Sequence, residues 1–90
     1  MLIEVAGRMP VEGDARMVVT VPHQNAMTVS VFDLLRRRVR VVVEGVRPAG
    51  VHPVVWDCHD GGGARVPAGV CVCMARCGRQ TASTRMVVMR

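Results

Sequence analysis

The sequence predicts an α+β domain in which a mixed sheet of four to five strands packs on one α-helix. Val supplies 20 of the 90 residues, and β-branched side chains fit a pleated strand better than a helix. One segment, which begins near Thr28, carries the signals of a helix start instead. At this length a second hydrophobic core is out of reach, so we expect residues 1–90 to form a single domain.

Two strands are expected near the N-terminus. Residues 1–6 alternate so that every second side chain faces a core, and residues 15–21 form another β-branched run. Turn-forming residues fill the segment 7–14 between them. Because the two runs are close in sequence, they are expected to pair as an antiparallel hairpin.

The predicted helix begins at Thr28. This residue can serve as the N-cap, and Met27 and Phe32 are spaced as a hydrophobic staple around it. At 100° per residue, one helix face carries a stripe of apolar side chains that would point to the core. These are Val31, Phe32, Leu35 and Val39.

The second half of the chain reads as short strands between loops. Residues 48–53 predict a Pro-rich loop and residues 57–64 a Gly-rich one. Pro67 and Gly69 interrupt the apolar run 66–74, which therefore predicts at best a short, irregular strand. The remaining expected segments are a strand at 54–56, a polar connector at 76–83 and a last strand at 84–89.

This order of elements resembles the ubiquitin-like β-grasp family. The matching features are a first strand that starts at Met1, a helix opened by Thr28 and Val29, and the terminal segment Ser83-Thr84-Arg85-Met86-Val87-Val88-Met89-Arg90. Arg85 stands where that family has a core Leu. A register shift of one residue would bury Met86 and Val88 instead.

The resemblance implies a non-catalytic protein-interaction domain, such as an adaptor or an assembly subunit. The conjugated members of the family end in Gly-Gly, whereas this sequence ends at Arg90, so we expect a member that is not conjugated. Partners would bind an apolar sheet face rimmed by Arg. The matching positions are Met9, Val55 and Val88, with Met86 and Arg90 at the rim. The alternative is that the apolar members of this set are core residues.

The charge of the chain suggests an anionic partner. Twelve Lys and Arg residues, all of them Arg, face seven acids, and Arg36, Arg37, Arg38 and Arg40 are clustered. This basic patch could bind an acidic protein surface or nucleic acid, which makes a ribonucleoprotein component the alternative function. A solvated helix end is the other interpretation of the cluster.

The cysteines allow a further alternative, a small zinc-stabilised module. Cys58, His59, Cys71, Cys73 and Cys77 include enough ligand types, but their spacing differs from paired Cys-x2-Cys ligands. We therefore expect buried, reduced thiols, with no metal and no cofactor. Cys58 and His59 are adjacent and would point to opposite faces of a strand, which argues against a nucleophile and base pair, so no enzyme activity is expected.

No secretory or membrane signal is recognised in the sequence. Charged residues interrupt every apolar stretch of the first thirty residues, and the longest uncharged run is shorter than a membrane span. An intracellular location, cytoplasmic or nuclear, is expected.

Overall fold

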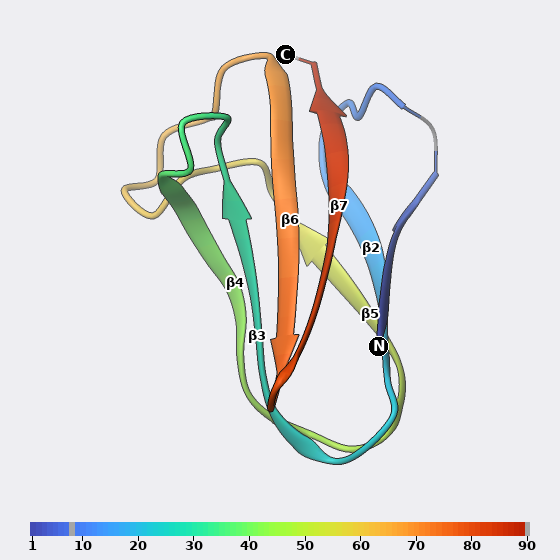
Figure 1. Cartoon of the computed structure of the whole chain (residues 1–90). Coiled ribbons are helices and arrows are strands. Elements are labelled where there is room, and N and C mark those ends of the chain that lie inside the picture. The colour runs from blue at the N-terminus through green and yellow to red at the C-terminus, as the bar shows by residue number, and fades with distance from the viewer. Residues whose placement is uncertain (8, 90) are drawn as a thin grey trace.

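The computed structural model describes residues 1–7 and 9–89, and these residues form strands, turns and loops only. There are two antiparallel sheets in these ranges, with strand orders β1-β2-β5 and β4-β3-β6-β7. Figure 1 shows the four-stranded sheet in front of the three-stranded one. The strands are β1 (Leu2–Ala6), β2 (Ala15–Val21), β3 (Asn25–Phe32), β4 (Arg38–Arg47), β5 (Gly50–Trp56), β6 (Gly69–Cys77) and β7 (Gln80–Val88).

The fold is therefore all-β, and the predicted α+β class is wrong. No helix lies in the described residues, and two sheets pack face to face where the prediction had one sheet on a helix. This arrangement also rules out the ubiquitin-like β-grasp fold. Three strands packed on four, with the chain passing between the sheets after β2, β4 and β5, define a β-sandwich of the immunoglobulin-like type.

The segment predicted as a helix is strand β3. Met27, Val29 and Val31 are buried and alternate with residues that face the other side of the sheet. This is the two-residue period of a strand, and it takes precedence over the helix signals at Thr28 and Phe32 because both neighbours of β3 hydrogen-bond to it. The helix start was a local pattern that the sheet overrode.

The expected second half of the helix is the turn between β3 and β4. One carboxylate oxygen of Asp33, Oδ1, accepts hydrogen bonds from the backbone N–H of Leu35 and of Arg37, each at 2.9 Å. Arg36 adopts a left-handed conformation with φ of 63°. Leu35, which was expected in the core, is 73% exposed. A side chain that bonds its own backbone in this way favours a turn over a helix.

The core lies between the two sheets and is built mostly from Val, Met and Cys. Trp56 is its largest fully buried side chain, and its Nε1 donates a hydrogen bond to the carbonyl oxygen of His59 at 3.0 Å. The other large buried side chains alternate along the strands. They are Met17, Val19, Val21, Met27, Val29, Val31, Cys73, Met86 and Val88.

The C-terminal third of the chain is more regular than the sequence suggested. The expected irregular strand is the nine-residue β6, and the expected connector 76–83 is mostly strand. Gly78 and Arg79 alone join β6 to β7, with Cys77 paired to Gln80. Gly78 has a φ of 60°, and Gly at the first of two turn positions is typical of a type II′ hairpin.

The first and last strands belong to different sheets. A single bridge outside the named strands joins β7 to the segment that follows β1: the N–H of Val11 donates to the carbonyl of Val87 at 2.7 Å, and the N–H of Met89 donates to Val11 at 2.8 Å. Within the described part of the chain no helix has the length and apolarity that a membrane crossing requires.

Replacing Gly78 with Ala is expected to destabilise the domain by about 1–2 kcal/mol, because an L-residue is strained at this φ. The added Cβ would also lie 2.5 Å from Nδ2 of Asn25, so that side chain must move. Urea denaturation measures the change. Gly61→Ala is the matched control, since its Cβ would meet nothing closer than 3.8 Å, and an equal loss in both variants would contradict the assignment.

Candidate functional site

An apolar stripe runs across the outer face of the four-stranded sheet. Phe32 pairs with Val72 and Ser30 pairs with Met74, so these side chains point away from the core next to one another. Phe32, Val72 and Met74 are half-buried by their neighbours on the same face. The three side chains form an apolar patch that no other segment of the described chain covers. Apolar surface patches that contain an aromatic residue are typical of binding sites.

Arginine side chains surround this stripe on three strands and one turn. Register places Arg38 opposite Phe32, Arg85 opposite Val72 and Arg76 opposite Thr28. No hydrogen bond or ion pair within the described residues uses these three guanidinium groups. We call the following set the arginine-rimmed face: Phe32, Val72, Met74, Arg36, Arg38, Arg76 and Arg85.

Two hollows indent the arginine-rimmed face, and Phe32 and Met74 form the wall between them. The first, of about 410 Å³, is apolar apart from its edge and is lined by Phe32, Asp33, Arg36, Val72 and Met74. The second, of about 460 Å³, is polar and is lined by Thr28, Ser30, Phe32, Arg38, Glu44, Met74 and Arg76. The face therefore offers an apolar subsite beside a cationic one.

The acids near this face leave its positive charge largely in place. Asp33 forms an ion pair with Arg37 at 2.9 Å. The pKa of the Asp33 carboxyl is lower than its ordinary value, and the main cause is the hydrogen bond from the backbone N–H of Arg37. Glu44 pairs with Thr28 at the polar hollow and is the acid that faces Arg38 and Arg76 there. The four arginines of the arginine-rimmed face are therefore opposed by one carboxylate that has no hydrogen-bond or ion-pair partner within the described residues, that of Glu44.

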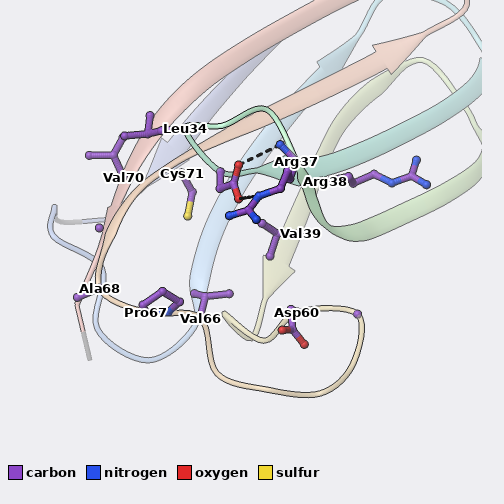
Figure 2. A pocket seen from close by; sticks show the side chains of 13 residues that line it. Leu34, Arg37, Arg38, Val39, Asp60, Val66, Pro67, Ala68, Val70 and Cys71 are labelled. Atoms are coloured by element: carbon purple, nitrogen blue, oxygen red, sulfur yellow. Dashed lines mark hydrogen bonds and ion pairs between the residues drawn. The ribbon is translucent and has the colours of Figure 1, made fainter.

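A separate groove lies at one end of the sandwich, where the β3–β4 turn meets the loop between β5 and β6 (Figure 1). Its volume is about 740 Å³. Figure 2 shows aliphatic side chains along its walls and the Arg37 guanidinium extending toward it from the turn. The groove shares Asp33 and Arg38 with the hollows above but opens beyond the end of the sheet.

The structure does not bring the predicted partner-binding residues together. Val55 is exposed on the outer face of the three-stranded sheet, and Met9 lies in the loop before Val11. Met86 and Val88 are 0% and 1% exposed, so their side chains lie in the core. Their burial matches the alternative register, in which a shift of one residue at Arg85 places Met86 and Val88 in the core. Arg90 lies outside the described residues.

The predicted basic patch is divided among three roles. Arg37 pairs with Asp33 in the turn. Arg40 donates to the carbonyl oxygens of His59 and Asp60, both at 3.3 Å, and so ties β4 to the loop after β5. Arg36 and Arg38 remain at the edge of the arginine-rimmed face. Because the segment is a turn followed by a strand, it is not the helix end that the sequence suggested.

The cysteines are small core residues. Cys71, Cys73 and Cys77 occupy alternate inward positions of β6, and all four cysteines are buried and unpaired. Among the described residues no three Cys, His, Asp or Glu side chains converge as metal ligands would. Burial raises the pKa of the Cys58 and Cys71 thiols and raises that of Cys73 to about 12, so these groups stay protonated at neutral pH.

Comparisons with known proteins support the fold only. No protein-family profile and no curated protein matches the chain. A crystal structure of dimeric latent PorU from Porphyromonas gingivalis contains a similar region, with a TM-score of 0.71 and 15% sequence identity. The match covers 97% of this chain and 9% of the PorU chain. At this identity the likeness concerns the β-sandwich and carries no activity.

Sequence reasoning missed Val72 and Met74, the centre of the arginine-rimmed face. Both were assigned to an irregular strand because Pro67 and Gly69 precede them, although they alternate with cysteines. Free Cys is among the most buried residue types, so the Val-Cys-Val-Cys-Met order was the signal that Val72 and Met74 face outward.

The register of β7 can be tested with two adjacent valines. Val88→Ala is expected to lower the free energy of unfolding by about 2–3 kcal/mol, because Val88 is fully buried and its removal leaves a cavity. Val87→Ala removes the same atoms from a residue that is 42% exposed and should cost well under half as much. Urea denaturation compares the two variants, and a reversed order would contradict the register.

The alkaline stability of the domain should report the buried thiols. The pKa of Cys73 is raised from 9.0 to about 12 in the folded state, so the folded state holds a proton that the unfolded state loses between these values. Stability is therefore complete below pH 9 and falls as pH rises toward 12, by up to about 1.4 kcal/mol per pH unit for each such proton.

The chain makes this measurement unusually clean, since it has neither Lys nor Tyr, the side chains that would otherwise titrate in that range. Urea denaturation under reducing conditions at stepped pH measures the slope. Cys73→Ala should flatten it, and an unchanged slope in that variant would assign the effect to other groups.

Proposed function

We propose that this chain is a non-catalytic protein-interaction domain that binds an acidic, partly apolar segment of a partner protein. The observation that carries the proposal is the arginine-rimmed face, in which an apolar stripe is flanked by four guanidinium groups. The net charge of +5 favours the approach of an acidic partner.

The chemistry of the face matches that of protein interfaces. Their centres are enriched in aromatic residues and Met, and Arg is the charged residue that they favour. Phe32 and Met74 can bury apolar surface, while a guanidinium can bind a carboxylate with two parallel hydrogen bonds. The apolar hollow and the polar hollow lie side by side, which suits an apolar residue followed by an acidic one.

The same residues give less support to nucleic-acid binding. Phe32 and Trp56 are the aromatic residues of the chain, and Trp56 is buried in the core. One half-buried aromatic, Phe32, cannot stack successive bases, as single-strand binding sites do. Catalysis is also poorly supported, since burial keeps the thiols Cys58, Cys71 and Cys73 protonated and away from solvent.

The proposal can be tested with a short peptide of alternating Leu and Glu. Titrated into ¹⁵N-labelled protein, it should shift the amide signals of Phe32, Val72 and Met74, and replacing Glu with Lys in the peptide should abolish the shifts. Val72→Asp should weaken binding by about tenfold or more, because it places a carboxylate in the apolar stripe.

Val51→Asp is the matched control, since Val51 is exposed on the outer face of the other sheet. It should bind the peptide as the parent does. If both variants bound equally, or if the shifts lay on the three-stranded sheet, the site would be wrong. An oligonucleotide that bound the same face more tightly, with a steep salt dependence, would favour the nucleic-acid alternative.

A further inference from the structure

The groove at the end of the sandwich has walls from three segments. The β3–β4 turn provides Asp33, Leu34 and Arg37, and β4 begins beside them with Arg38 and Val39. The loop between β5 and β6 and the start of β6 form the opposite wall. Its residues are Asp60, Gly61, Val66, Pro67, Ala68, Gly69, Val70 and Cys71.

The walls are mostly aliphatic. Figure 2 shows Leu34 and Val70 at one end of the groove, Cys71 and Val39 along it, and Val66 and Pro67 below them. A volume of about 740 Å³ lies within the range of small-molecule sites, which are lined by apolar side chains with a few polar groups. Leu34 is 66% exposed, although Leu side chains are more often buried.

The two carboxylates of the groove, Asp33 and Asp60, each accept hydrogen bonds from their own loops. Asp33 accepts two backbone N–H groups on Oδ1 and the Arg37 Nε–H on Oδ2. Oδ1 of Asp60 accepts the N–H groups of Gly62 and Ala64, at 2.9 and 3.0 Å. These bonds hold the two carboxylates to their own loops.

The donors of the groove are less fully used. Within the described residues the Arg37 guanidinium donates from its Nε only, which leaves its two terminal nitrogens unpaired. In Figure 2 this guanidinium extends between Cys71 and Val39, whereas the Arg38 side chain points away from the groove. An apolar channel with one cationic donor group at its side matches a ligand that has an apolar body and an anionic end.

We infer that this groove binds a small aliphatic monocarboxylate, with its chain along Leu34, Val66 and Val70 and its carboxylate on the terminal nitrogens of Arg37. This site is distinct from the arginine-rimmed face and does not depend on the proposed function. The Asp33 carboxylate orients Arg37, so the cation is held in place before a ligand arrives.

Hexanoate titrated into ¹⁵N-labelled protein tests the inference. It should give saturable shifts at the amides of Leu34, Ala68 and Val70. Hexanol, which lacks the charge, should bind about tenfold more weakly, and hexylamine should not bind. Shifts that stay linear with concentration, or equal shifts with hexylamine, would overturn the inference.

Variants locate the site. Arg37→Gln keeps most of the side-chain length without the charge and should weaken hexanoate binding about tenfold, whereas Arg79→Gln in the β6–β7 turn should not. Ala68→Phe should block the groove from an exposed wall position. Val72→Asp should leave hexanoate binding unchanged, which separates this site from the arginine-rimmed face. Unchanged affinity in both Arg37→Gln and Ala68→Phe would refute the site.

Discussion

The two-residue alternation of β3 is the constraint on which the structure depends. Met27, Val29 and Val31 point inward from a strand that is hydrogen-bonded on both sides, so they fix which face of the four-stranded sheet is the core. A shift of one residue would turn all three to solvent and bring Thr28 and Phe32 inside. The same alternation therefore decides that Phe32 belongs to the outer surface, where it can contact a partner.

The composition of the core explains why apolar side chains remain for that surface. In a β-sandwich, side chains of moderate size fill the space between the two sheets. Here Val, Met and Cys fill it around the single Trp56. The inward positions of β6 are Cys and Ala, whereas its outward positions include Val72 and Met74. The larger side chains of this strand thus face solvent. Packing within the domain does not explain this arrangement, whereas the binding of a partner to this face would explain it.

The first two strands could be predicted from the sequence, whereas the fold class and the strand β3 could not. The runs 1–6 and 15–21 pair as expected because alternation and a nearby turn are local signals. The helix prediction was wrong because the cap and staple pattern at Thr28 is also a local signal, and pairing of β3 with both neighbours outweighs it. The strand then ends in the turn that Asp33 closes. Which sheet each strand joins is a long-range property, so the arginine-rimmed face, assembled from β3, β4, β6 and β7, could not be located from spacing alone.

The arginines show why charge counts did not identify a site. Arg65 donates to the carbonyl oxygens of Gly13, Asp57 and Met89, and thereby joins three separate segments at one end of the sandwich. Arg40 ties β4 to the loop after β5 in the same way, through two backbone carbonyl oxygens of that loop. A guanidinium that replaces water at several backbone carbonyls stabilises the fold and is no longer available to a ligand. The remaining arginines at the rim have no such partners among the described residues. The same residue type thus serves structure or recognition according to whether the topology places a carbonyl within its reach.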